Sequence, residues 1–395
     1  MALSIAIDHQ RVPGLPEPHE PFEGVQRIAV LRGGGLGDLV FALPAIAALR
    51  AAYPDAEVTL LGSPSHRALL AGRGLVDDVV DLPAVPGVGS PTAEPADDDT
   101  VERFFAGQRA RGYDLAVQVH GGGRNSNPFL LRLGARHTVG TRTPDAVDLE
   151  RSMPYVYYQH EVLRALEVVA LAGAVAASGG PLLSPSDDER AAALSVLPAA
   201  GDGSPLVVVH PGASDPRRRW PASRFAETVA ALAADGCRVA VVGGEEDRAD
   251  AERIVEQARE RIAGSRVADP EAIVALAGEV GLTVLLGVLE SADVVIGNDS
   301  GPRHLAEAVG ARTSSVFWYG NVINAAPLGR TDHRVAIAHR TTCPVCGVDI
   351  SQVGWTAERC QHDDSVVADV TVDEVLANTR ELLGRADAAG PAPSA

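Results

Sequence analysis

Short apolar runs that end in glycine or a small polar turn, each followed by an amphipathic stretch, recur along the chain. The first half is predicted to contain four strands, at residues 27–31, 57–61, 79–82 and 115–119. The second half repeats the pattern, with strands expected at residues 206–209, 238–242, 293–296 and 313–317. Strands that alternate with helices indicate parallel sheets with helices on both faces. The pattern therefore predicts an α/β chain made of two consecutive Rossmann-like halves.

Changes in composition suggest where these halves begin and end. At 395 residues, the chain suits two domains of roughly 150–200 residues each. Stretches rich in Gly, Ser and Pro lie between the two sets of strands and indicate an interdomain linker. We expect an N-terminal extension at 1–24, a first domain at 25–180, a linker region at 181–204, a second domain at 205–385 and a disordered tail at 386–395.

Composition excludes some classes of function. The formal net charge is −18, so a nucleic-acid partner, which needs clustered cations, is not expected. A nucleotide-sized ligand needs only a local positive pocket. Because all 34 basic residues are arginine, such a pocket must be built from arginine, histidine or backbone N–H groups. No apolar run is long enough to span a bilayer, and residues 1–23 lack the features of a signal peptide, so we expect a cytoplasmic protein.

A glycine-rich turn, Gly33–Gly37, joins the first predicted strand to a helix that begins near Asp38. Glycine lets the backbone approach a ligand closely, and a helix start presents free N–H groups. The dinucleotide fingerprint G-x-G-x-x-G is not matched, because Asp38 occupies the place of its third glycine. Asp38 is either the N-cap of this helix or a carboxylate that accepts a proton from an incoming hydroxyl.

Two loops of the second half have the residues to hold a diphosphate. The first runs from His210 through Ser214 to three arginines, Arg217–Arg219. Guanidinium groups bind phosphate bidentately, and a solvated loop is the alternative interpretation. The second loop, Gly297–His304, follows an apolar strand and opens a helix. Backbone N–H groups, the Ser300 hydroxyl and His304 are expected to hold a diphosphate there, and the alternative is a helix capped by Asp299 or Ser300.

A third loop of the second half carries acids. Glu245 and Glu246 follow the strand at 238–242 and a glycine pair that begins at Gly243. Acids in this place can hydrogen-bond ribose hydroxyls. The alternative is that they stabilise the first turn of the next helix.

These motifs resemble, in order and spacing, those of glycosyltransferase family 9, the ADP-heptose:lipopolysaccharide heptosyltransferase family. The resemblance covers about residues 28–383. A G-D-x-x-x-x-x-P motif is matched by Gly37-Asp38 and Pro44, and the family's G-N-D-S/T-G signature is matched at residues 297–301 with His304. The arginine loop before Trp-Pro matches a loop that carries a basic residue, commonly lysine, in the family. The segment 118–128 resembles an acceptor loop.

The resemblance implies a GT-B fold, with two Rossmann-like domains facing a cleft, and an inverting transfer with Asp38 as general base. The donor implied is ADP-heptose, with a nucleotide hexose as the alternative. The acceptor is either a lipopolysaccharide-like glycan or a small natural product, and peripheral membrane association is compatible with it. No cofactor is implied for catalysis. The donor-binding residues expected are Gly212, Ser214, Arg218, Arg219, Gly243, Glu245, Glu246, Asp299, Ser300, Gly301 and His304. The acceptor-binding residues expected are Gly35, Gly37, His120, Arg124 and Asn125.

Four residues near the C-terminus form a partial zinc pattern: Cys343, Cys346, Cys360 and His362. A C-x-x-C pair is followed by a third thiol and an imidazole, which are ligands that zinc prefers. Members of the resembled family often carry four cysteines in this region, and one is missing here, around residues 349–352. The interpretations are a structural zinc site and a loop of reduced thiols.

Two other classes of function remain as alternatives. A nucleotide-sugar epimerase or NAD-dependent oxidoreductase would require the dinucleotide fingerprint, which is mismatched at Asp38. A non-catalytic protein that binds nucleotide sugars would not require Asp38 together with the motif at 299–304. We therefore expect an enzyme, a glycosyltransferase.

Overall fold

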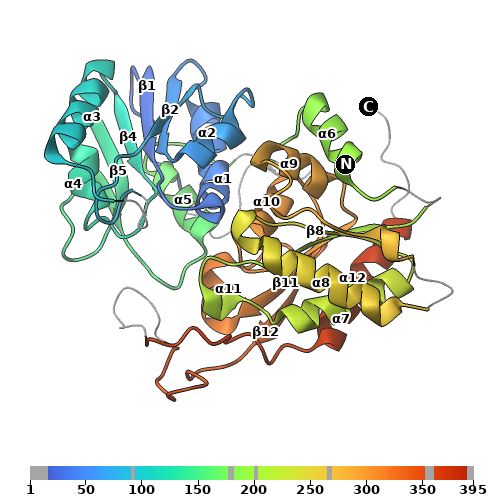
Figure 1. Ribbon diagram of the computed structural model, residues 1–395. Coiled ribbons are helices and arrows are strands. Elements are labelled where there is room, and N and C mark those ends of the chain that lie inside the picture. Colours follow the sequence, from blue (N-terminus) through green and yellow to red (C-terminus); the bar gives the residue numbers. More distant parts are fainter. Residues whose placement is uncertain are drawn as a thin grey trace, which may run out of the picture. The chain divides into compact units, whose positions relative to one another are not determined.

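The structure, a computed structural model, describes residues 17–89, 94–176, 182–199, 203–264, 269–351 and 360–388. The chain divides into two compact units, Met1–Leu182 and Leu183–Ala395. Each unit contains one six-stranded sheet with helices on its faces (Figure 1). The division lies within the region expected to be the linker. That region also contains helix α6 (Asp187–Val196), which belongs to the second unit.

The first unit is a parallel sheet in the order β3-β2-β1-β4-β5-β6. Its strands are β1 (Arg27–Leu31), β2 (Glu57–Gly62), β3 (Asp78–Asp81), β4 (Leu115–Gln118), β5 (His137–Arg142) and β6 (Arg151–Pro154). Its helices are α1 (Leu36–Ala52), α2 (Pro64–Leu70), α3 (Asp98–Arg111), α4 (Ser126–Leu131) and α5 (Glu161–Ala170). The expected N-terminal extension is in part packed on this unit, because Phe22 is buried and its ring stacks on that of His137.

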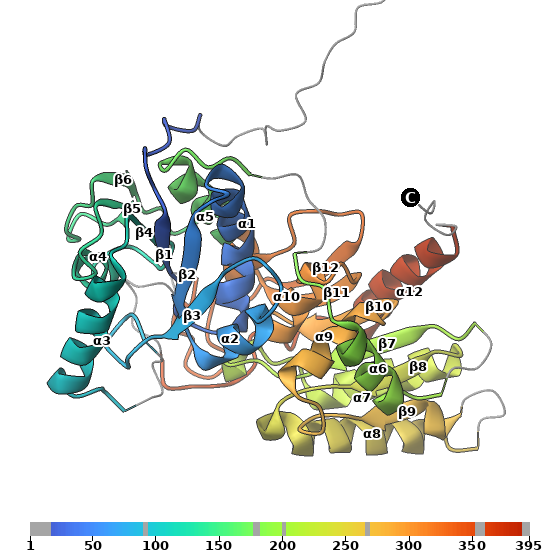
Figure 2. The same cartoon turned by 90° about the horizontal axis from the view of Figure 1, so that it is seen from above.

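The second unit repeats this topology, in the order β12-β11-β10-β7-β8-β9. Its strands are β7 (Leu206–His210), β8 (Arg238–Val241), β9 (Ile273–Ala275), β10 (Val294–Asn298), β11 (Thr313–Trp318) and β12 (His333–Ala338). Its remaining helices are α7 (Ala222–Ala234), α8 (Arg248–Ile262), α9 (Leu282–Glu290), α10 (Gly301–Ala308), α11 (Tyr319–Ala325) and α12 (Val372–Ala388). Helices α7 and α8 lie side by side along one face of this sheet (Figures 1 and 2).

The strand order places a reversal point in each sheet. Numbered within its own unit, each sheet follows the order 3-2-1-4-5-6, so the chain changes direction of winding between the first and fourth strands. In the first unit these are β1 and β4, and in the second they are β7 and β10. Ligands of open parallel sheets bind beyond the carboxyl ends of the strands at this point. The predicted motifs therefore lie where the fold favours binding.

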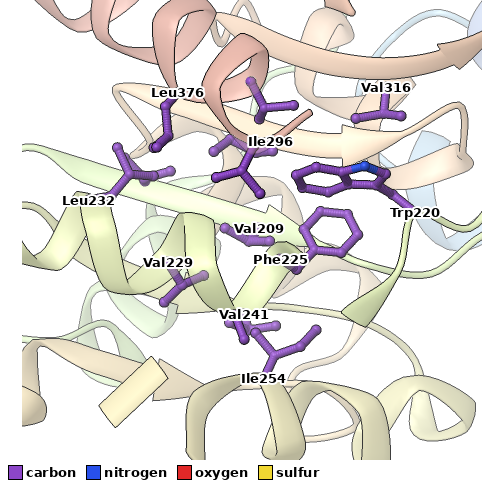
Figure 3. Close-up of a cluster of buried hydrophobic side chains, with 14 of the residues drawn as sticks. Val209, Trp220, Phe225, Val229, Leu232, Val241, Ile254, Ile296, Val316 and Leu376 are labelled. Atoms are coloured by element: carbon purple, nitrogen blue, oxygen red, sulfur yellow. The ribbon is translucent and has the colours of Figure 1, made fainter. Parts of the chain in front are cut away.

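Apolar side chains of both sheet faces form the cores. In the second unit, Trp220 and Phe225 pack edge to face with ring centroids 4.9 Å apart, close to Val209 and Ile296 on the central strands (Figure 3). The indole N–H of Trp220 donates to the carbonyl of Val370 at 3.0 Å, so this buried ring has its polar partner. The core thus ties the arginine loop, which precedes Trp220, to the C-terminal part of the chain.

All eight strands expected from the sequence are present, with ends that differ by one or two residues. Strands β5, β6, β9 and β12 were not predicted. Strands β5 and β6 lie at one end of the first sheet and contain polar residues, whereas β9 and β12 are the two edges of the second sheet. Strand β9 is apolar but has only three residues, and β12 begins with His333 and Arg334.

Candidate active site

The turn after β1 carries Asp38, the expected general base. Helix α1 begins at Leu36 and its N-cap is Gly35, so the interpretation of Asp38 as the N-cap is wrong. Asp38 lies in the first helical turn, where its Oδ2 accepts a hydrogen bond from the N–H of Gly35 at 2.8 Å. Its Oδ1 accepts one from Nη2 of Arg32, also at 2.8 Å. The side chain is 49% exposed, and each carboxylate oxygen can accept a further hydrogen bond.

Glycine is required at one position of this turn. Gly34 has φ +94°, and a Cβ built on it would lie 2.4 Å from Oδ2 of Asp38. A side chain there would strain the backbone and displace the carboxylate. Two of the expected acceptor residues are close by, since Gly35 is the N-cap of α1 and Gly37 is its second residue.

Two histidines lie at the same turn. Nε2 of His66, from α2, is 3.3 Å from the carbonyl oxygen of Gly35. His120, an expected acceptor residue that follows β4, has Nε2 3.0 Å from the carbonyl oxygen of Gly87. Burial lowers the pKa of each imidazole, against the opposing charge of Asp38. Both rings are therefore neutral near pH 7. His66 was missed by the sequence analysis because a lone histidine in a helix carries no motif.

The loop after β4 contains the other expected acceptor residues. Nε2 of Gln118 donates to the hydroxyl of Ser126 at 2.6 Å, and this buried pair fixes the ends of the loop. Asn125 is the N-cap of α4 and lies against Gly87. Arg124 is 76% exposed. A cationic side chain presented by a braced loop can bind an anionic or hydroxyl-rich acceptor.

The arginine loop of the second unit is less cationic than its sequence indicates. Arg217 is buried and bound to Asp215, with Nη2 2.6 Å from the carboxylate. Nη1 of Arg218 lies 2.9 Å from Oδ2 of Asp299. Nε of Arg219 donates a hydrogen bond to the carbonyl oxygen of Ala213 at 2.8 Å. Two of the three arginines therefore have a carboxylate partner within the protein.

Asp299 lies at the centre of a buried polar cluster. Its Oδ2 accepts from Arg218 and from Nδ2 of Asn321 at 2.7 Å, while its Oδ1 is 3.2 Å from Nε2 of His304. Burial alone would raise the pKa of Asp299, but the His304 hydrogen bond and the Arg218 charge together lower it well below its usual range. Burial lowers the pKa of His304 to about 4, with the charge of Arg303 acting in the same direction. The carboxylate is therefore ionised and directed at Arg218.

Asp299 was expected to bind the donor, and its carboxylate is held by Arg218, Asn321 and His304. It is placed to orient the arginine. Asn321, which begins no recognisable motif, was missed by the sequence analysis for that reason.

A second polar chain joins the ends of the central strands. Nδ1 of His210, at the end of β7, lies 3.0 Å from Oγ of Ser300, the N-cap of α10. Nε2 of His210 is 3.5 Å from Oδ2 of Asp247. Asp247 also accepts from the N–H of Gly244 at 3.2 Å. The chain fixes Ser300 and leaves Gly301 as the first residue of the helix, with its N–H free of the helical ladder.

The acid loop after β8 turns Asp247 inward. Gly212 and Gly243 are both expected donor residues, and a Cβ on either would collide with Asp247 at less than 3 Å. Glu245 is exposed and bound to Arg248 on its own helix, with Oε2 2.7 Å from Nη2. Glu246 is also exposed. Asp247, which was not among the expected site residues, is thus the acid that braces this end of the sheet.

The three cysteines and the histidine near the C-terminus lie together. The ligand atoms of Cys343, Cys346, Cys360 and His362 are all within 4.8 Å of one another. Backbone N–H groups of Cys346 and Val345 donate to the Cys343 sulfur and lower the pKa of its thiol to about 6. Three thiolates and one imidazole are a donor set that fits a tetrahedral metal ion. Cys237 is buried elsewhere, in the core.

Comparisons with known sequences point to one family. A family model described as glycosyltransferase family 9 (heptosyltransferase) matches residues 101–346. The chain is 23% identical over 305 residues to lipooligosaccharide heptosyltransferase 2 of Haemophilus ducreyi, covering 74% of this chain and 83% of that protein. It is 26% identical over 317 residues to lipopolysaccharide heptosyltransferase 3 of Escherichia coli, covering 75% of this chain and 82% of that protein. A match to the lipopolysaccharide core heptosyltransferase OpsX of Haemophilus influenzae is 23% identical over 27% of this chain and spans only 30% of that protein.

Comparisons with solved structures agree on the fold. ADP-heptose lps heptosyltransferase II of E. coli superposes with a TM-score of 0.67 at 18% identity, covering 92% of this chain and 99% of that one. The iron-containing dodecameric glycosyltransferase TibC of E. coli superposes with a TM-score of 0.54 at 13% identity, covering 94% of this chain and 82% of that one. These likenesses confirm the expected GT-B fold. Among the described residues, no helix is long and apolar enough to cross a membrane.

Proposed function

This chain belongs to glycosyltransferase family 9, the heptosyltransferase family, and on that premise we propose that it transfers heptose from ADP-heptose to an acceptor hydroxyl with inversion at the anomeric carbon. The observation that carries the proposal is the half-exposed carboxylate of Asp38, held by two hydrogen bonds at the reversal point of the first sheet. A carboxylate in this state is accessible to an incoming hydroxyl, as a general base must be.

In the proposed reaction, Asp38 takes the proton of the acceptor hydroxyl. The oxygen attacks the anomeric carbon, a new C–O bond forms, and the bond between that carbon and the diphosphate oxygen breaks. ADP leaves with the bonding electron pair. Because negative charge grows on the departing diphosphate, fixed cations and N–H donors lower the barrier most. No metal or organic cofactor takes part in these steps.

The second unit has the groups to hold the diphosphate. Arg218 is oriented by Asp299, and Arg219 is held by the Ala213 carbonyl. The N–H of Gly301, the first residue of α10, lies outside the helical ladder beside Ser300. We propose that these groups bind the leaving ADP. Donor binding is therefore assigned to the second unit and proton abstraction to the first.

The acceptor remains one of two kinds. The names of the relatives favour a lipopolysaccharide-core glycan. A small natural-product hydroxyl is the alternative expected from the sequence. Arg124 and the neutral His120 are the side chains assigned to the acceptor. The cytoplasmic location expected from the sequence belongs to the same proposal.

The decisive experiment separates donor binding from transfer. Asp38→Asn should bind ADP as tightly as the unchanged protein in calorimetry, yet transfer heptose at least about 10²-fold more slowly with a lipopolysaccharide-core acceptor. Asp81→Asn is the matched control, since Asp81 is an exposed carboxylate of the same unit that pairs with Arg67 at 3.2 Å. Unchanged turnover in Asp38→Asn would refute the base assignment. Thermal-shift screening with ADP- and UDP-sugars tests the donor, and no stabilisation by any of them would refute the transferase proposal.

We also propose that Cys343, Cys346, Cys360 and His362 hold one structural zinc ion. The proposal rests on the convergence of the four ligand atoms and on their chemistry. Metal analysis of the purified protein should give one equivalent per chain, and both zinc and iron should be measured because TibC is iron-containing. Cys346→Ser should lose the metal, whereas Cys237→Ala, a core cysteine outside the cluster, should retain it. A metal-free chain with reactive thiols would support the alternative of reduced cysteines.

A further inference from the structure

An arginine lies buried beneath the glycine turn of the first unit. The Arg32 side chain is only 6% exposed. Its Nη1 donates to the carbonyl oxygen of Val119 at 2.6 Å, which ties the end of β1 to the end of β4. Burying a guanidinium is unfavourable unless its charge and donors are matched. The groups that bind the guanidinium therefore indicate the role of Arg32.

Two of the donors of Arg32 bind one residue. Nε donates to the main-chain oxygen of Asp38 at 2.8 Å, and Nη2 donates to its Oδ1 at 2.8 Å. A planar guanidinium that bonds both the backbone and the side chain of one residue fixes the side-chain torsion of that residue and the position of its charge. The N–H of Gly35 holds the other carboxylate oxygen, at 2.8 Å.

Arg32 is held in turn by a second pair of charges. Oε2 of Glu161, at the start of α5, lies 3.5 Å from Nη2 of Arg32. The other oxygen of Glu161 accepts from Arg164, which is also buried. Arg164 donates to the main-chain oxygens of Val156 and Gln159 at 2.8 and 2.9 Å. Asp38, Arg32, Glu161 and Arg164 therefore form a chain of four groups of alternating charge. Asp38, the proposed base, is its exposed end.

We propose that Arg32 is the positioning residue for the general base, with Glu161 holding Arg32 in place. The inference rests on the proposed role of Asp38. Lysine cannot replace this arginine, because one ammonium on a flexible stem does not bond the carbonyl and the carboxylate in a fixed plane. A base displaced by about 1 Å transfers its proton roughly 10²-fold more slowly. Because Arg32 is buried beneath the turn and bonded to Asp38, its loss is expected to act through Asp38.

The experiment compares Arg32→Ala and Arg32→Lys with Arg50→Met. Arg50 is a matched control, because its Nη1 bonds the carbonyl of Ala56 and its Nη2 bonds the carboxylate of Asp77, at 2.9 and 2.7 Å, in the same unit. Both Arg32 variants should lower kcat about 10²-fold with KM for the donor and the affinity for ADP changed less than twofold. Millimolar guanidinium should restore kcat of Arg32→Ala at least about tenfold and should leave Arg50→Met unaffected.

The outcomes separate this inference from the proposed function. Loss of turnover in Asp38→Asn together with unchanged kcat in both Arg32 variants overturns the positioning role alone. Equal loss in the Arg32 and Arg50 variants, without guanidinium rescue, shows that the arginine only stabilises the unit. Should Arg32→Ala fail to fold, Arg32→Lys decides, since a kcat within threefold of the unchanged protein contradicts the proposal. Turnover that survives in Asp38→Asn refutes the base and the inference together.

Discussion

Nη1 of Arg218 lies 2.9 Å from Oδ2 of Asp299, and the carboxylate is almost entirely buried while the guanidinium is 23% exposed. The Nη2 of the same arginine donates to Oγ of Ser214 at 3.0 Å, and part of the side chain still reaches solvent. A cation fixed in this way is pre-organised for an incoming phosphate and needs little rearrangement to bind it. We therefore propose that the acid of the family signature supports the cation.

Asp299→Asn should weaken ADP binding at least about tenfold. The amide keeps the shape of the side chain but leaves Arg218 without its counter-charge, and breaking a buried ion pair destabilises a protein by about 3–5 kcal/mol. Calorimetry with ADP and urea unfolding measure the two effects. Asp215→Asn is the control, because it breaks the Asp215–Arg217 pair of the same loop. If Asp299→Asn binds ADP as tightly as the unchanged protein, Asp299 does not orient the donor site.

Gly34→Ala should slow transfer and spare donor binding. The left-handed backbone at φ +94° costs a non-glycine residue roughly 1–3 kcal/mol, and the new methyl group would collide with Oδ2 of Asp38. The displaced base should lower kcat about 10²-fold. Gly72→Ala is matched in backbone, with φ +71° and no atom within 4 Å of the new Cβ. Equal turnover in the two variants would mean that the geometry of the turn does not matter for transfer.

The free energy of unfolding should fall as the pH drops from 6.5 to about 4. Burial holds the pKa of His304 at about 4, so between these values the unfolded chain binds the proton and the folded chain does not. Stability from this group is complete above pH 6.5 and is lost through this window. His333, whose pKa burial also lowers to about 4, adds to the same slope. Urea unfolding at several pH values should show a shallower slope in His304→Gln, and an unchanged slope would contradict the assignment.

The sequence was sufficient for the fold because the central strands are continuous apolar runs ending in glycine. The edge strand β6 escaped prediction because its side chains are mostly polar and only partly buried, and β9 because a run of three apolar residues is too short to identify a strand. At the site, motif positions such as Asp38 and Asp299 were found, and so were Arg218 and His304, but other partners of the two acids were not. Arg32 and Asn321 belong to no pattern, since their roles arise from contacts across the fold.

The cysteine cluster should influence nucleotide affinity from a distance. The segment that follows His362 forms hydrogen bonds with the arginine loop. The hydroxyl of Ser365 donates to the carbonyl oxygen of Arg219 at 2.6 Å. The N–H of Val366 donates to the carbonyl oxygen of Arg217 at 2.8 Å. A metal ion that fixes Cys360 and His362 fixes the start of this segment. Loss of the ion would release the segment and loosen the arginines, which bind phosphate only when oriented.

Cys346→Ser is the variant that tests this connection. Cys346 is exposed and belongs to the metal cluster and not to the arginine loop, so a change in nucleotide binding is expected to act through the cluster. We expect its affinity for ADP to fall about threefold to tenfold, and a chelator should produce the same loss in the unchanged protein. Cys237→Ala, in the same unit, should bind ADP normally before and after chelation. If the metal-free protein binds ADP as tightly as the metal-loaded one, the cluster stabilises its own loop and has no influence on the donor site.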